Sequence, residues 1–90
     1  MTKNELMKEY ERLTREKGVR LDGINYNCNK STIENAINCL RCSDDMLNDY
    51  LTVIKLKYPN TYNTIKNNGD FKTHSFNRLY VYNTARMALN

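Results

Sequence analysis

Residues 43–59 read SDDMLNDYLTVIKLKYP, and they predict a central helix of an all-α fold. Ser43 is expected to cap the first turn, where the two following aspartates suit the positive end of the helix dipole. Pro59 ends the helix, because the residue before a proline avoids the α region. Val53 and Leu56 lie off the main apolar face, so this helix is expected to be central or part of an interface. That face consists of Met46, Leu47, Tyr50, Leu51, Ile54 and Tyr58.

Two capping boxes predict the helices that precede this one. Residues 2–5 (TKNE) and 31–34 (STIE) each place a hydroxyl three residues before a glutamate, which satisfies two backbone N–H groups at a helix start. Apolar residues then recur with helical spacing, which predicts helices over 3–17 and 32–41. Gly18 is expected to end the first helix by taking a positive φ.

Two more helices are predicted after Pro59, over residues 60–67 and 76–88, the second capped by Ser75. Residues 79–82 (LYVY) have strand propensity as well. The helix is preferred because the apolar pattern continues to Met87 and no partner strand is visible.

The resulting fold is a small single-domain bundle of four to five short helices. It divides in sequence into a helix–loop–helix-like hairpin over residues 1–42 and the remaining helices over 43–90. The expected core is apolar and aromatic: Leu6, Tyr10, Leu13, Ile33, Ile37, Leu40, Leu47, Tyr50, Leu51, Ile54, Phe76, Leu79 and Tyr80.

The net charge of +4 falls entirely in the second half of the chain. Residues 1–45 balance, whereas residues 46–90 carry six Lys and Arg against two Asp. Such an excess permits an acidic partner, nucleic acid first among them, although ordinary charge fluctuation gives the same pattern.

A cytoplasmic location is expected. No apolar run approaches the roughly 18 residues that a membrane span needs, and residues 1–6 lack the apolar stretch of a secretory signal. The three cysteines cannot all pair within one chain, which suits a reducing compartment.

No catalytic or metal site is predicted. All three serines occupy predicted helix caps, and His74 has no matched acid or nucleophile. Cys39 and Cys42 have the spacing of a pair of zinc ligands, and Cys28 with His74 would complete the four ligands of a zinc site. A closed zinc site normally shows two short pairs and only one is present, so the cysteines are interpreted as packing residues without a metal or other cofactor.

The first 42 residues carry a family resemblance. Residues 4–8 (NELMK), Gly18-Val19 and residues 30–37 (KSTIENAI) together resemble the SAP-like group of helix–extended loop–helix domains. Many such domains bind DNA with the loop and the start of the second helix near the phosphate backbone. The resemblance implies that Lys30, Ser31 and Thr32 contact a phosphate, which suits a helix N-terminus beside a lysine.

The last predicted helix offers a second candidate surface. Arg78, Tyr82 and Arg86 recur at i, i+4 and i+8, so two arginines flank a ring that can stack on a base or pack on a protein. The alternative is a solvated helix edge whose arginine stems cover apolar surface. The other candidate contacts are lysines of the basic half: Lys55, Lys66 and Lys72.

Two functions of different class follow, both non-enzymatic. The first is a nucleic-acid-binding module, monomeric or dimeric, that uses residues 30–32 and the basic half of the chain. The second is a protein–protein regulator or inhibitor, for instance a phage- or mobile-element-encoded protein that acts on a bacterial host enzyme. The same tyrosine and arginines would then anchor a protein interface.

Overall fold

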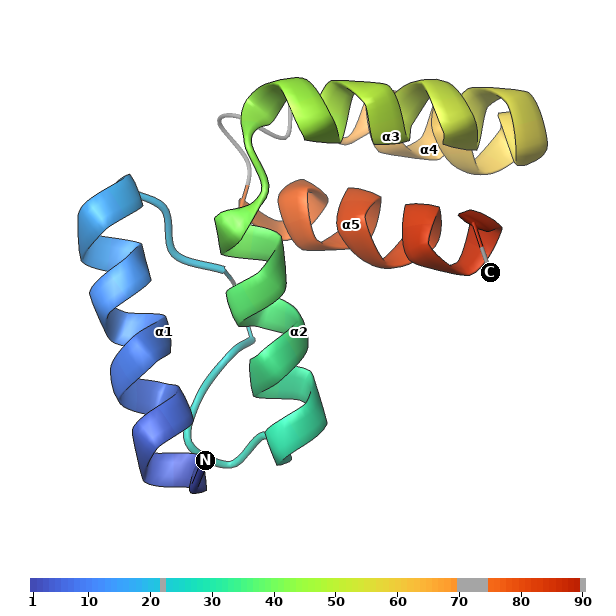
Figure 1. The fold of residues 1–90 in the computed structure, drawn as a ribbon. Coiled ribbons are helices and arrows are strands. Elements are labelled where there is room, and N and C mark those ends of the chain that lie inside the picture. The colour runs from blue at the N-terminus through green and yellow to red at the C-terminus, as the bar shows by residue number, and fades with distance from the viewer. Residues whose placement is uncertain (22, 70–74, 90) are drawn as a thin grey trace. The chain divides into compact units, whose positions relative to one another are not determined.

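The described part of the chain is entirely helix and loop. The computed structural model describes residues 1–21, 23–69 and 75–89, with side chains from residue 78 onward in the last segment. This confirms the all-α prediction, and residues 79–82 are helical rather than a strand. The helices are α1 (Lys3–Lys17), α2 (Lys30–Arg41), α3 (Asp44–Lys57), α4 (Pro59–Asn67) and α5 (Ser75–Leu89) (Figure 1).

The helices form two compact units. Unit 1 spans Met1–Arg41 and contains α1 and α2, and unit 2 spans Cys42–Asn90 and contains α3, α4 and α5. α1 packs on α2 in the first unit, and α3 packs on both α4 and α5 in the second.

In unit 1, α1 and α2 run in the same direction (Figure 1), and the loop between them is described at residues 18–21 and 23–29. The loop travels back along α1, because Leu21 bonds to Tyr10 in the middle of α1 and Tyr26 bonds to Asn4 near its start. The start of α2 therefore lies at the same end of unit 1 as the start of α1.

The ends of α1 follow the predicted local signals. The Thr2 hydroxyl accepts from the Glu5 N–H at 3.2 Å, and the Glu5 carboxylate accepts from the Thr2 N–H at 3.0 Å. Gly18 takes φ 68°, and its N–H bonds to the Thr14 carbonyl at 2.9 Å. Both the capping box and the glycine at the helix end are confirmed.

The second predicted capping box is wrong. α2 begins at Lys30, and the Asn29 side-chain oxygen accepts from the Thr32 N–H at 2.9 Å. Ser31 lies inside the first turn, where its hydroxyl donates to the same Asn29 oxygen at 3.0 Å. Asparagine is as good a helix cap as serine, so the cap lies two residues earlier than predicted.

In unit 2, a serine cap and a proline set the bounds of α3. The Ser43 hydroxyl accepts from the Met46 N–H at 3.1 Å, as predicted. α3 ends at Lys57, and Pro59 occupies the first turn of α4, where its missing N–H has no cost.

α5 turns a different face inward from the one predicted. Val81, Tyr82 and Ala85 are buried, whereas Met87 is 68% exposed and Leu79 is only half-buried. The prediction followed the larger apolar residues, but the buried face of α5 combines Val81 and Tyr82 with two alanines, Ala85 and Ala88. The side chain of the predicted core residue Phe76 lies outside the described residues.

The predicted core of α1, α2 and α3 is otherwise largely buried, although Tyr50 and Leu51 are only half-buried. The return loop adds two buried residues, Leu21 and Ile24, that helical periodicity does not reveal. The loop therefore belongs to the core of unit 1.

Candidate nucleic-acid interface

The three residues predicted at the start of the second helix lie together in its first turn. Lys30 and Ser31 are exposed and Thr32 is half-buried. The Thr32 N–H is occupied by the Asn29 cap. Within the described part of unit 1, the N–H groups of Lys30 and Ser31 have no acceptor. Free N–H groups at the positive end of a helix dipole beside a lysine favour an anion.

The start of α1 adds a second cation and an aromatic ring at the same end of unit 1. The Lys3 amine lies 5.3 Å from the ring centroid of Tyr26, which is 53% exposed. The Tyr26 hydroxyl donates to the Asn4 side-chain oxygen, so the ring is held against α1. Tyr26 was not predicted as a site residue, because it lies in the loop between α1 and α2, where the sequence has no helical periodicity.

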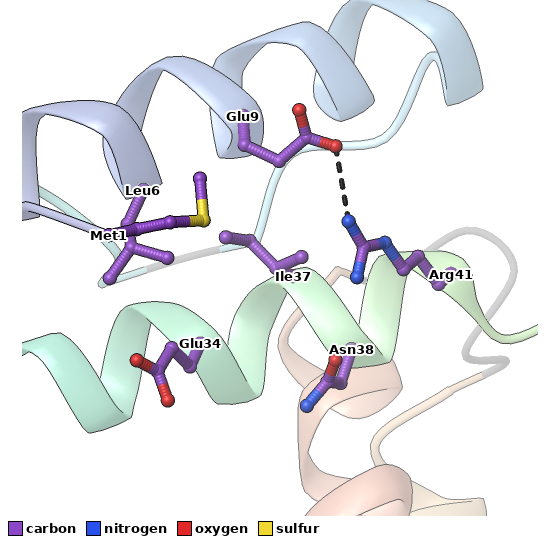
Figure 2. A pocket seen from close by; sticks show the side chains of 7 residues that line it. All are labelled: Met1, Leu6, Glu9, Glu34, Ile37, Asn38 and Arg41. Atoms are coloured by element: carbon purple, nitrogen blue, oxygen red, sulfur yellow. Dashed lines mark hydrogen bonds and ion pairs between the residues drawn. The ribbon is translucent and has the colours of Figure 1, made fainter.

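The acidic groups near this end are partly engaged. The Glu5 carboxylate is bonded to Thr2, and this hydrogen bonding lowers the pKa of Glu5. Glu34 is exposed and lines an open hollow of about 230 Å³ between α1 and α2. In Figure 2, Met1, Leu6 and Ile37 form the apolar part of this hollow.

An ion pair lies at one side of the hollow. The Arg41 guanidinium donates to the Glu9 carboxylate at 3.3 Å, which joins the end of α2 to the middle of α1 (Figure 2). Arg12 also donates to Glu9, and these bonds lower the pKa of Glu9, the one from Arg12 most strongly. The contact therefore links the two parallel helices at the surface of unit 1.

The predicted lysines of unit 2 are exposed where they are described. Lys55 and Lys66 both lie on the surface, and the Lys55 amine is 5.6 Å from the ring centroid of Tyr62. Lys72 lies outside the described residues.

The predicted Arg78/Tyr82/Arg86 surface is not an exposed stripe. Arg78 is 7% exposed and forms an ion pair with Asp44 at the start of α3. Tyr82 is 4% exposed, and its ring centroid lies 6.3 Å from that of Tyr50. Arg86 alone is exposed, with its guanidinium 6.0 Å from the Tyr82 ring centroid. A base cannot stack on Tyr82 in this arrangement, because α5 turns that face inward.

The cysteines show no metal-binding arrangement. The Cys28 thiol donates to the Gly23 carbonyl at 3.3 Å, Cys39 is buried, and burial raises the pKa of the Cys42 thiol. No cluster of three metal-ligating side chains occurs in residues 1–21, 23–69 and 78–89. His74 lies outside that set.

No family model, curated protein or solved structure matches this chain. Among the helices of the described segments, none has the length and apolar character to cross a membrane.

Proposed function

We propose that this chain is a nucleic-acid-binding module whose contact surface is the end of unit 1 where α1 and α2 both begin. The observation that carries the proposal is the parallel packing of the two helices, which places both positive dipole ends together. Lys3, Lys30 and Tyr26 lie at this same end. The order of helix, loop and helix in unit 1 also supports the proposal, because it is the order expected from the SAP-like resemblance.

The chemistry at this end suits a phosphate backbone. Lys30 supplies a mobile positive charge, and the N–H groups of Lys30 and Ser31 supply directional donors. Lys3 adds a second charge, held beside Tyr26. These groups would fix the position of a strand without reading its sequence.

The test is a fluorescence-anisotropy titration of labelled duplex DNA at several salt concentrations. Log K is expected to fall linearly with log salt, and Lys30→Ala is expected to flatten the slope by about 0.9, the contribution of one phosphate contact. Lys17→Ala is the matched control, because Lys17 is exposed in the last turn of α1, at the opposite end of the helix. Absence of duplex binding at low salt, or equal effects of the two variants, would contradict the proposal.

A protein partner is the second candidate function, supported by apolar exposure in unit 2. The Lys57 amine donates to the Ala88 carbonyl at 2.7 Å, which brings the end of α3 near the end of α5. The residues flanking this bond in sequence are apolar or aromatic and exposed. They are Leu56, Tyr58, Met87 and Leu89.

Exposed side chains of this kind are common at protein interfaces. A pull-down from bacterial lysate after nuclease treatment separates the two functions. A regulator is expected to retain one stoichiometric protein, which Leu56→Asp releases and Lys30→Ala does not. Loss of all captured protein on nuclease treatment would refute this second function.

A further inference from the structure

A groove on the outer face of α1 shares Tyr26 with the proposed contact surface and adds cations that this surface does not use. It has a volume of about 610 Å³, within the usual range for a ligand site. Met7 and Tyr26 form its apolar and aromatic part, and Lys8, Arg12 and Arg15 line it along one helix stripe. The groove lies wholly within unit 1.

The ion pairs of α1 decide which of these cations can take a ligand. Arg12 donates to Glu9 at 2.6 Å and to Glu16 at 2.7 Å, so its guanidinium is already engaged. Lys8 and Arg15 are exposed and form no ion pair with the described residues of unit 1.

The one acidic residue of the groove is neutralised. Both oxygens of the Glu11 carboxylate accept from the Arg20 guanidinium, at 2.8 and 2.9 Å. This hydrogen bonding lowers the pKa of Glu11, so the pair persists at neutral pH. An anionic ligand in the groove would therefore meet Lys8 and Arg15 without an opposing free carboxylate.

We propose that this groove binds a single nucleic-acid strand, with an unpaired base stacked on Tyr26 near the start of α1 and two phosphates further along the strand held by Lys8 and Arg15. The ring is ordered in advance by its bond to Asn4, which reduces the entropy lost on stacking. Lys8 and Arg15 are seven residues apart, about 10 Å along the helix, the rise of roughly three stacked nucleotides.

An unpaired strand fits the groove better than a duplex does. Base–aromatic stacking requires a base whose face is accessible, and in a duplex the faces are covered by neighbouring pairs. An acidic peptide would satisfy the cations but would leave the Tyr26 ring without a stacking partner. The inference rests on the proposed function and specifies the strand that this second site of unit 1 accepts.

The experiment compares labelled oligothymidine with a duplex of equal length by anisotropy, using wild type, Tyr26→Ala and Tyr26→Phe. Tyr26→Ala is expected to weaken single-strand binding roughly 5- to 150-fold, the range of one lost stacking contact. Tyr26→Phe keeps the ring but loses its bond to Asn4, so it should bind the single strand less tightly than wild type and more tightly than Tyr26→Ala. Tyr58→Ala, at an exposed tyrosine of unit 2, is the matched control.

A second variant tests the phosphate contacts. Lys8→Ala combined with Arg15→Ala should flatten the single-strand salt slope by about 1.4, or 0.7 for each lost phosphate contact. The salt slope of duplex binding should be unchanged by this double variant but flattened by Lys30→Ala. Circular dichroism of each variant establishes that unit 1 remains folded.

The two proposals fail in different ways. If Tyr26→Ala leaves single-strand affinity unchanged, the groove proposal is overturned, even where Lys30→Ala weakens the duplex. If Tyr26→Ala weakens the single strand while Lys30→Ala has no effect on the duplex, the groove proposal holds and the contact surface at the helix starts is wrong. Displacement of the strand by oligo-glutamate, without any effect of Tyr26→Ala, would assign the groove to acidic peptides instead.

Discussion

Replacing Tyr10 by phenylalanine tests how the return loop of unit 1 is held. Tyr10 is fully buried, and its hydroxyl accepts from the Leu21 N–H at 3.1 Å and donates to the Leu21 carbonyl at 3.2 Å. Leu21 is also buried, so water does not readily replace either bond. The substitution leaves the aromatic ring in place and deprives two buried backbone groups of their partner.

The magnitude follows from the cost of an unsatisfied buried group. Each such group costs about 1–3 kcal/mol, and phenylalanine leaves almost no cavity, so the loss of both partners should destabilise unit 1 by about 2–6 kcal/mol. A domain of this size has a free energy of unfolding on the order of 5–13 kcal/mol. The change therefore removes a large share of the stability.

Urea denaturation followed by circular dichroism measures the loss, and amide hydrogen exchange at Leu21 localises it. Tyr26→Phe is the matched control, because it removes a hydroxyl that bonds to Asn4 at the exposed surface. Its cost should stay within about 1 kcal/mol. If Tyr10→Phe costs no more than Tyr26→Phe, or the Leu21 amide stays protected, the loop is not held by the Tyr10 hydroxyl.

Two further predictions concern the start of α2 and the acid stability of unit 1. Asn29→Ala should lower the free energy of unfolding by about 0.5–2 kcal/mol, because the helix cap is lost, and Ser31→Ala should lower it clearly less. Urea denaturation measures both changes. A larger loss for Ser31→Ala would show that the serine is the cap. The pKa values of Glu9 and Glu11 are lowered from 4.5 by hydrogen bonds from arginines. The stabilisation of unit 1 by these two carboxylates is therefore complete above about pH 4.5, and it is lost as the pH falls through their lowered pKa values in the folded state. A melting temperature that stays constant from pH 6 to pH 3 would argue against this linkage.

The ends of the helices were the best-predicted part of the fold. The hydroxyl of Thr2, the glycine at position 18 and the hydroxyl of Ser43 each act within four residues of their own position, so sequence spacing alone reveals them. The start of α2 was wrong by two residues because Asn29 and Ser31 are both competent caps, and only packing chooses between them.

The candidate site was predicted less well than the fold. Lys30, Ser31 and Thr32 lie in the first turn of α2, with Lys30 and Ser31 exposed, and the phosphate contact that the resemblance implies for them stays a prediction. Arg78 and Tyr82 are buried instead of exposed, because the rotation of α5 depends on the small residues that pack against its neighbours. The apolar pattern of a helix shows which residues share a face, but it favours the face with the larger side chains as the buried one. A buried face that contains alanine is then missed.

By itself, the sequence determined that this chain is helical and where most of its helices begin and end, because those signals are local hydrogen bonds and backbone preferences. Only the tertiary structure decided that α1 and α2 run parallel and that Tyr26 lies beside Lys3. Those features depend on Tyr10 meeting Leu21 and Asn4 meeting Tyr26, contacts 11 and 22 residues apart in the sequence. Such contacts form only when a loop without periodicity folds back on a helix, so no local pattern encodes them.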